Sequence, residues 1–240
     1  MADTLTDENR ERLRTVSAAT LTTALFKRGF RNTFIQNVHR LNARGGNMVG
    51  EAFTLRYVPA REDLDTLDGF TDPEHPQRKA VETCPPGHVF VIDSRKDPRA
   101  ASAGGILVTR LMKRGVAGVV TDGGFRDAPE IATLDIPAYH RRPSAPTNLI
   151  RHHACDIDVP IGCGDVPVYP GDIVVGDGEG VVVIPAHLAN EVAEEAFEMT
   201  AFEDFVTEEV RDGASTVGLY PPTKDETRVK YEAWRKANGR

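Results

Sequence analysis

The sequence has 240 residues, of which 40% are hydrophobic and 27% are charged, as in an ordinary globular protein. Its formal net charge of −7 repels phosphate backbones, which argues against generic binding of nucleic acid. No stretch reaches the roughly 18 apolar residues of a membrane-spanning helix, and the polar, acidic first residues resemble neither a signal nor a transit peptide. We therefore expect a cytoplasmic protein with no membrane or nucleic-acid partner.

The first third of the chain predicts a helix, a strand and a surface segment. Residues 7–28 carry an apolar stripe between Thr6, which can cap a helix, and Gly29, which can end one, so a single helix is predicted. The alternating pattern of residues 49–58 predicts a half-buried strand. Residues 59–86 are charged and rich in proline, which indicates a surface segment with one short helix at residues 77–83.

The middle of the chain predicts a β-α-β unit. A strand at residues 88–93 precedes a helix from about Ala103 to Arg114, and a second strand spans residues 116–121. We expect a short helix after Asp127 and a further strand near Ile136. These elements predict an α/β fold.

The last third of the chain predicts short strands followed by helical extensions. Glycines divide residues 157–185 into several strands, and the G-x-G-x-G segment at 176–180 leads into a strand, which is typical of a hairpin turn and not of a nucleotide loop. Residues 186–211 predict a long amphipathic helix, and residues 219–240 form an arm. We expect one domain over residues 1–240. The three cysteines show no metal-binding spacing, so buried thiols are predicted (Cys84, Cys155, Cys163).

Candidate site residues gather between residues 93 and 130. The predicted helix opens at Gly104-Gly105-Ile106-Leu107, where exposed backbone N–H groups and the helix dipole favour a carboxylate. The next strand leads to Arg126, which can bind a carboxylate with two hydrogen bonds, and to Asp127, which can bind Mg²⁺. Such a set suits a small 2-oxo acid. An arginine beside an aspartate is also typical of a solvated pair or a helix cap, and spacing alone leaves both interpretations open.

The run GGILVTRLMKRGVAGVVTDGGFRDAPEI resembles the signature of the RraA-like family, and VPIGCGDVPVYPGDIVVGDGEGVVVIP is a further match. That family includes class II 4-hydroxy-4-methyl-2-oxoglutarate / 4-carboxy-4-hydroxy-2-oxoadipate aldolases and the RraA regulators of ribonuclease E. The likeness covers about residues 12–213, which leaves residues 214–240 as a C-terminal arm. It implies a swivelling β/α sandwich with helical extensions at both ends. It also implies a homotrimer or homohexamer with sites between neighbouring subunits.

The resemblance implies a role for each matching residue. Arg126 is similar to the family arginine that binds the carboxylate and keto oxygen of pyruvate, and Asp127 is similar to the aspartate that holds Mg²⁺ or Mn²⁺. Ile106 and Leu107 fall where backbone N–H groups hold the substrate carboxylate. Glu203 aligns with a glutamate that reaches the metal of a neighbouring subunit through water.

One position departs from the aldolases, which carry an aspartate separated from the arginine by twenty residues. Here that position is Gly105, so one acidic group near the metal is missing, and Asp93, Asp97 and Asp122 are candidates to replace it.

From the candidate residues and the resemblance together, we predict a metal-dependent lyase of the aldolase or decarboxylase type, acting on a 4-hydroxy-2-oxo acid or an oxaloacetate-like substrate through a pyruvate enolate. The alternatives are a dehydratase of a 2-oxo-3-deoxy sugar acid and a non-catalytic inhibitor of ribonuclease E.

Overall fold

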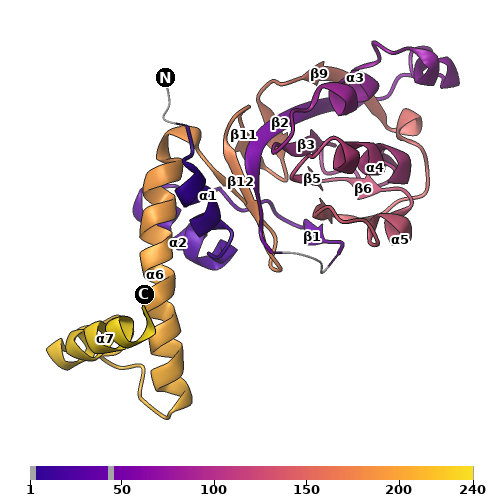
Figure 1. Cartoon of the computed structure of the whole chain (residues 1–240). Helices are drawn as coiled ribbons and strands as arrows, with labels where there is room; N and C mark the ends of the chain where they lie inside the picture. Colours follow the sequence, from indigo (N-terminus) through magenta and orange to yellow (C-terminus); the bar gives the residue numbers. More distant parts are fainter. Residues whose placement is uncertain (1–3, 43–45, 240) are drawn as a thin grey trace.

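A computed structural model describes residues 4–42 and 46–239 (Figure 1). Within that part of the chain, an eight-stranded mixed sheet has the order β1-β7-β5-β3-β2-β12-β13, and β9 also pairs with β2. Its centre is parallel, since β2, β3, β5 and β7 run in one direction. The strand bounds are β1 (His39–Arg40), β2 (Met48–Pro59), β3 (Val89–Asp93), β5 (Gly118–Thr121), β7 (Ala138–His140), β9 (His152–Ile157), β12 (Ile173–Gly176) and β13 (Val181–Ile184).

The long strand β2 joins two parts of this sheet. Its first residues, 48–51, pair with β12, whereas residues 52–56 pair with β3. Two smaller sheets accompany it. One is parallel and contains β4 (Ala101–Ala103), β6 (Gly124–Phe125) and β8 (Arg142–Pro143), and the other is the hairpin of β10 (Ile161–Cys163) and β11 (Val166–Val168).

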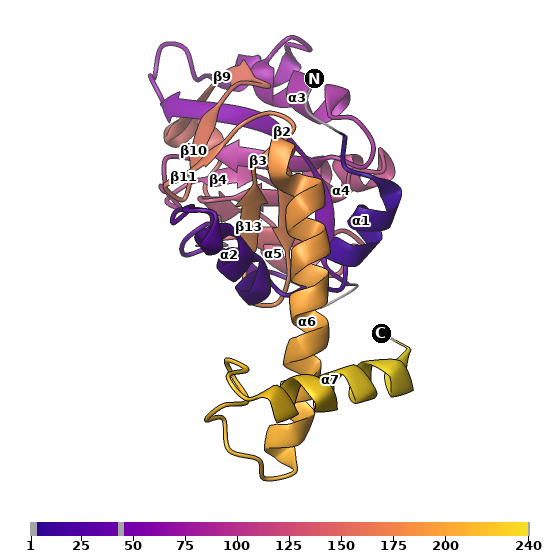
Figure 2. The same cartoon turned by 90° about the vertical axis from the view of Figure 1, so that its left-hand side faces the viewer.

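The helices form two groups beside the sheet (Figures 1 and 2). The first group packs against β12, β13 and the start of β2, and contains α1 (Asp7–Leu13), α2 (Ala18–Lys27) and α6 (Ala189–Arg211). The second packs against β3, β5 and the end of β2, and contains α3 (Pro76–Thr83), α4 (Gly105–Lys113) and α5 (Ala128–Ile131). The described residues also form 3-10 turns, namely η1 (Leu67–Thr71), η2 (Asn148–Ile150) and η3 (Ala186–Leu188). The predicted α/β class and sandwich are confirmed.

Several predicted elements differ in detail. The single helix predicted at residues 7–28 is wrong, because the first helix ends at Leu13 and Ser17 caps a second one, its Oγ accepting the Thr20 N–H at 3.0 Å. The helix expected from Ala103 begins only at Gly105, after the short strand β4. The hairpin turn at residues 176–180 is confirmed. Of the cysteines, Cys155 is partly exposed because it lies on the edge strand β9, so it is not a buried thiol.

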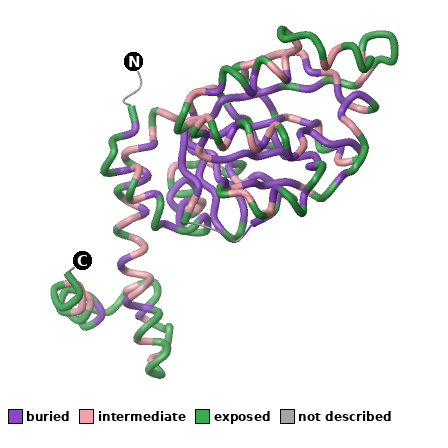
Figure 3. The backbone as a smooth tube through the Cα atoms, turned by 45° about the vertical axis from the view of Figure 1, so that its right-hand side comes forward, coloured by how far each residue is buried: buried purple, intermediate pink, exposed green. Residues whose placement is uncertain are grey.

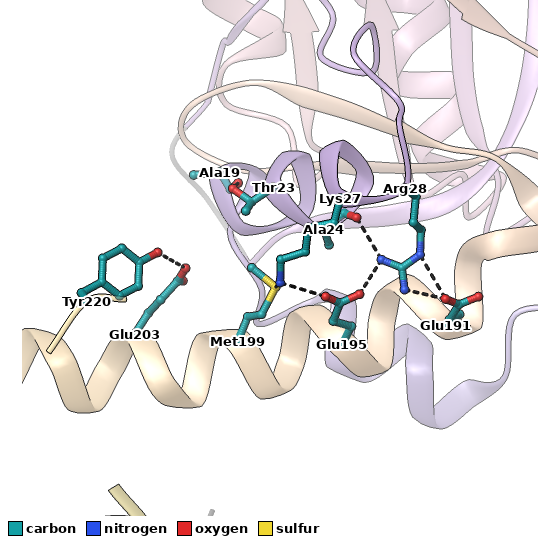
Figure 4. A network of polar contacts seen from close by, with 10 residues as sticks. All are labelled: Ala19, Thr23, Ala24, Lys27, Arg28, Glu191, Glu195, Met199, Glu203 and Tyr220. Atoms are coloured by element: carbon teal, nitrogen blue, oxygen red, sulfur yellow. Dashed lines mark hydrogen bonds and ion pairs between the residues drawn. The ribbon is translucent and has the colours of Figure 1, made fainter. Parts of the chain in front are cut away.

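The lower half of α6 extends beyond the sheet and carries the C-terminal arm (Figures 1 and 3). The arm forms the helix α7 (Asp225–Asn238), which packs on α6 through an aromatic cluster. Where α6 meets α2, Lys27 and Arg28 form ion pairs with Glu191 and Glu195 (Figure 4). No helix in the described part of the chain is both long and apolar enough to cross a membrane.

Candidate functional site

The predicted site residues meet at the carboxyl ends of two neighbouring strands. β4 and β6 are parallel neighbours, so their carboxyl ends lie at one edge of the small sheet. Gly104 follows β4 and Arg126 follows β6, and the Arg126 N–H donates to the Ala103 carbonyl at 3.0 Å. The N-terminus of α4 and the Arg126-Asp127 pair are therefore brought to the same edge, which is the common place for a ligand in an α/β protein.

A cavity of about 270 Å³ opens at this edge. It is lined by Gly104, Ile106, Leu107, Arg126 and Asp127, whereas Gly105 is buried behind its wall. The rest of its lining comes from residues to which the sequence analysis gave no role: Phe70, Gln77, Arg78, Ala101, Ala103, Thr147 and Asn148. A larger cavity of about 600 Å³ lies beside α2, but it contains none of the predicted site residues, so the smaller cavity is the candidate site.

The N-terminus of α4 presents free backbone donors to the cavity. Its N-cap residue is Gly104, which makes no side-chain cap. The Gly105 N–H instead donates to Asp127 Oδ2 at 3.2 Å. The N–H groups of Ile106 and Leu107 belong to the first turn, which has no acceptors within the helix. Together with the helix dipole, these groups suit a carboxylate.

Asp127 is held in an unusual backbone conformation that directs its carboxylate to α4. Its φ is 59° and its ψ is 32°, in the left-handed region that L-residues adopt rarely and at a cost of roughly 1–3 kcal/mol. Although it stands at the N-cap of α5, its side chain makes no cap there. Arg126 Nε lies 3.7 Å from Asp127 Oδ1, and both side chains are about half exposed. Solvent screens the attraction between two charges that are this far apart and this exposed, so the guanidinium remains able to bind a ligand.

Glu130 is an acidic residue beside Gly105 to which the sequence analysis gave no role. A Cβ atom added to Gly105 would lie 3.1 Å from Glu130 Oε2 and 3.3 Å from Asp127 Cβ. The Glu130 carboxylate therefore stands beside the position where the aldolases carry their aspartate. The sequence contains a pattern that could have identified Glu130, because Asp127 and Glu130 are three residues apart at the start of a predicted helix, a spacing that places side chains on one face.

Comparison with known proteins places the chain in a family. The RraA-like family, described as Aldolase/RraA, matches residues 15–183. This chain belongs to the RraA-like family.

Relatives of this RraA-like protein carry two kinds of name. A Halalkalibacterium halodurans protein with the provisional name 4-hydroxy-4-methyl-2-oxoglutarate aldolase is 33% identical over 59% of this chain and 67% of its own length. Protein DlpA of Legionella pneumophila is 24% identical, and the match covers 72% of this chain but only 27% of DlpA. The crystal structure of Streptomyces coelicolor RraAS2, described as an unusual member of the RNase ES inhibitor RraA protein family, matches with a TM-score of 0.75. It is 29% identical and the match covers 85% of this chain and 97% of RraAS2.

The three aspartates considered as replacements at position 105 have other partners in this RraA-like protein, so that expectation is wrong. Asp93 and Asp122 accept backbone N–H groups of adjacent loops, at 2.7–3.4 Å, and Asp97 pairs with two arginines. Burial raises the pKa of Asp122 to about 6, and its three N–H donors oppose that rise. These carboxylates hold loops in place, and Glu130 is the acidic group nearest to position 105.

Glu203 lies away from the cavity within the chain, on the side of the molecule that carries α2 and α6 (Figures 1 and 4). Its carboxylate accepts hydrogen bonds from Thr20 Oγ1 at 2.7 Å and from the Tyr220 hydroxyl at 3.4 Å. The described residues hold no group of three or more histidine, cysteine or acidic side chains that could bind a metal. Mg²⁺ is commonly held by only one or two carboxylates, with water and substrate as its other ligands, so Asp127 and Glu130 fit this ion.

His140 supports the site from behind and predicts a sensitivity to acid. It stacks on Phe125 of β6 with ring centroids 5.5 Å apart, and its Nδ1 is buried without a partner among the described residues. Burial, and secondarily the nearby His39, lowers the pKa of His140 to about 4.

Because the unfolded chain takes up this proton near pH 6.5 and the folded chain does not, the free energy of unfolding should fall as pH drops from about 6.5 to about 4. His140→Gln, which carries no charge, is expected to remove on the order of 2 kcal/mol of that fall. Urea denaturation of both proteins at pH 7 and pH 4.5 measures the difference. If the wild type and His140→Gln lost equal stability between pH 7 and pH 4.5, His140 would not be the group that makes the protein sensitive to acid.

Proposed function

We propose that this RraA-like protein is a divalent-metal-dependent lyase that acts on a 4-hydroxy-2-oxo acid or an oxaloacetate-like substrate. One observation carries the proposal: the N-terminus of α4, Arg126 and Asp127 line one cavity, and Glu130 Oε2 lies 3.1 Å from where a Cβ of Gly105 would stand. An anion cradle, a fixed cation and two acidic groups are what a metal-bound 2-oxo acid needs. The relatives that carry an aldolase name support the same reaction class.

Asp127 and Glu130 would hold Mg²⁺ or Mn²⁺ in this proposal. When bound, the ion supplies a Lewis acid that stabilises negative charge on substrate oxygens. Gly105 supports this assignment, because it puts no side chain at a point 3.1 Å from Glu130 Oε2 and 3.3 Å from Asp127 Cβ.

The protein's own groups then bind and orient the 2-oxo end of the substrate. The N–H groups of Ile106 and Leu107 and the Arg126 guanidinium would hold the C1 carboxylate, and Arg126 would also donate to the C2 keto oxygen. The C4 hydroxyl proton would pass to water, the C3–C4 bond would break to leave a carbonyl group at C4, and the bonding electrons would remain in the enolate of pyruvate. The enolate would then take up a proton at C3 to give pyruvate. The charge of the enolate lies on the C2 oxygen, beside Arg126, and a fixed donor at that position typically contributes about 10²–10³-fold to the rate. Loss of CO₂ from oxaloacetate gives the same enolate.

A release assay for pyruvate tests the proposal. With lactate dehydrogenase as the coupling enzyme, we expect pyruvate from oxaloacetate or 4-hydroxy-4-methyl-2-oxoglutarate in the presence of Mg²⁺. EDTA should abolish the signal and added Mg²⁺ should restore it. The dehydratase alternative is tested with a panel of 2-oxo-3-deoxy sugar acids, by measuring the disappearance of each substrate. Absence of turnover with every substrate, or turnover that EDTA does not affect, would contradict a metal-dependent lyase.

A non-catalytic inhibitor of a ribonuclease is the second candidate function. The likeness to Streptomyces coelicolor RraAS2 favours it, because that structure matches most of this chain. Assembly into a homotrimer or homohexamer stays a prediction, and so does the contact of Glu203 with the metal of a neighbouring subunit. The division into a core at about residues 12–213 and an arm at residues 214–240 also stays a prediction.

A further inference from the structure

The segment between β2 and α3 projects from the body of the molecule (Figure 1). Most of its residues are exposed, and η1 lies in its middle. Phe70 of η1 forms part of the cavity wall, so the segment borders the place where a ligand would lie. The proposed reaction at Arg126 gives this segment no role.

The first half of the segment is fixed to the body of the molecule. The Ala60 N–H donates to the Arg151 carbonyl at 3.1 Å. Asp65 Oδ1 lies 2.9 Å from His153 Nδ1 of β9, and the Asp65 side chain is only 2% exposed. Residues 60–65 therefore form an anchored base, which ends at the buried carboxylate of Asp65.

The second half of the segment, residues 66–75, is held more loosely, and we call it the lid. Within the described part of the chain, its hydrogen bonds stay inside the lid or reach Lys79 of α3. The backbone bonds of η1 are long, with 3.2 Å from the Gly69 nitrogen to the Thr66 oxygen and 3.4 Å from the Asp72 nitrogen to the Gly69 oxygen. Segments that are exposed and weakly bonded to the body open and close at a low cost in free energy.

Two buried nitrogen atoms lie where the lid meets α3. His75 Nδ1 and Arg78 Nε have no hydrogen-bond partner among the described residues. The ring of Phe70 lies over the Arg78 guanidinium, with 5.3 Å between the ring centroid and the guanidinium carbon. A buried polar atom without a partner costs free energy that a rearrangement can recover. The observed position of the lid is therefore only weakly preferred.

Large apolar side chains around the mouth of the cavity are exposed. Leu67 of the lid is 73% exposed, Ile106 of α4 is 82% exposed and Ile150 of η2 is 55% exposed. Ile106 lines the cavity, and Ile150 is two residues from Asn148, which also lines it. Exposed apolar side chains that gather around a cavity indicate a surface that becomes covered when the cavity is in use.

We propose that the lid closes over the cavity when a 2-oxo acid is bound, so that Leu67 packs against Ile106 and Ile150. The inference rests on the proposed function, in that the ligand is a 2-oxo acid at Arg126. A ligand shifts such an equilibrium only if it contacts the closed state better than the open one, and the ring of Phe70, which already lines the cavity, supplies that contact.

Closure turns the lid about the anchored base at Asp65 and the first turn of α3. It replaces water beside the ligand by apolar side chains. Exclusion of water strengthens the electrostatic interaction between the Arg126 guanidinium and the developing enolate, as lids of enzymes commonly do.

Thiol labelling at position 67 tests the inference, because Leu67 does not line the cavity and a ligand there cannot cover it directly. In a Cys155→Ser background, the remaining native cysteines, Cys84 and Cys163, are buried. N-ethylmaleimide should label Leu67→Cys about tenfold more slowly with saturating pyruvate and Mg²⁺ than without them. The reason is that a lid closed in about nine molecules of ten reacts only in the tenth.

Leu64→Cys is the matched control for labelling. Leu64 is also an exposed leucine, at 51%, but it lies on the anchored base, so its labelling rate should not change. Calorimetry with pyruvate and Mg²⁺ gives a second measure. Leu67→Ser should weaken pyruvate binding about tenfold, since closure buries the leucine side chain, whereas Leu64→Ser should leave the affinity unchanged.

Three results would overturn the inference. The first is an unchanged labelling rate of Leu67→Cys at pyruvate concentrations that saturate binding, or an absence of pyruvate binding. The second is equal slowing at positions 64 and 67. The third is protection of position 67 that needs no pyruvate and increases with protein concentration, which would assign the apolar side chains around the mouth to contact with a second copy of the chain.

The outcome is separable from that of the lyase proposal. Pyruvate-dependent protection of position 67, without pyruvate release from any substrate, would support the lid and contradict the lyase. Pyruvate release from oxaloacetate with no change in labelling would support the lyase and contradict the lid.

Discussion

Asp127→Asn is expected to reduce metal-dependent pyruvate release by about a thousandfold or more. The reason is that a metal Lewis acid contributes several kcal/mol to such reactions, and a neutral amide is a poor ligand for Mg²⁺. The substitution removes one of the two carboxylates, Asp127 and Glu130, that lie beside Gly105 at the N-terminus of α4. We expect the loss to appear in kcat/KM with oxaloacetate at every Mg²⁺ concentration that the assay allows.

Asparagine is the right replacement because it preserves the local structure. Asp127 has a φ of 59°, and asparagine is one of the few L-residues that adopt this conformation readily. Its amide oxygen can also accept the Gly105 N–H that Asp127 Oδ2 accepts at 3.2 Å. The thermal unfolding temperature should therefore stay close to that of the wild type, which separates a lost metal ligand from a lost fold.

Asp135→Asn provides the matched control, because Asp135 is exposed and lies outside the cavity. That variant should keep wild-type activity. If Asp127→Asn released pyruvate as fast as the wild type did, Asp127 would have no place in the metal site and the lyase mechanism would need another anchor.

The parts of the site that the sequence predicted are those that lie close together along the chain. Gly104, Arg126 and Asp127 belong to one β-α-β pattern, and parallel strands bring such residues to one edge because their carboxyl ends coincide. Strand and helix periodicity was clear for residues 88–121. The three-residue strand β4 and two-residue strand β6 were missed, since so few residues show no period.

The second wall of the cavity could not be predicted in the same way. Arg78 and Asn148 are separated by long stretches of chain from each other and from Arg126, and they meet only through tertiary packing. Neither stands in a recognisable motif. The break between α1 and α2 shows a different limit: an apolar stripe continues across it, but the serine cap at Ser17 starts a new helix.

Position 105 shows how a resemblance can mislead when it is applied one residue at a time. Gly105 suggested a missing acidic group and three distant aspartates as substitutes. The structure instead shows that the space left by a glycine is bordered by Glu130 Oε2, 3.1 Å from where a Cβ would stand. The acidic function has a candidate in a different residue that reaches the same point from α5.

Glu130→Gln should therefore weaken Mg²⁺ binding by about 10- to 100-fold, and Gly105→Asp should restore part of that loss in the double variant. The first effect follows because groups that support a metal site typically contribute this much to affinity or activity. The second follows because an aspartate at position 105 places a carboxylate beside residue 130, where a glutamine has the same shape as the glutamate but carries no charge to repel it. Without Glu130→Gln, the added aspartate would stand beside two existing carboxylates. In either background its Cβ would lie 3.3 Å from Asp127 Cβ.

Titration with Mn²⁺, followed by electron paramagnetic resonance, measures metal affinity independently of turnover. The Mg²⁺ concentration for half-maximal pyruvate release gives a second measure, and Glu226→Gln on the exposed face of α7 serves as the control.

If Glu130→Gln bound metal as the wild type does, the glutamate would be a solvated surface group. If Glu130→Gln lost metal affinity and the double variant with Gly105→Asp recovered none of it, a carboxylate near position 105 would not be sufficient to restore metal binding. The role of Glu130 would then depend on the direction from which it approaches the ion. Recovery in the double variant would show that the two positions exchange one function, so that this chain and the aldolases reach the same charge at the metal from different elements of the fold.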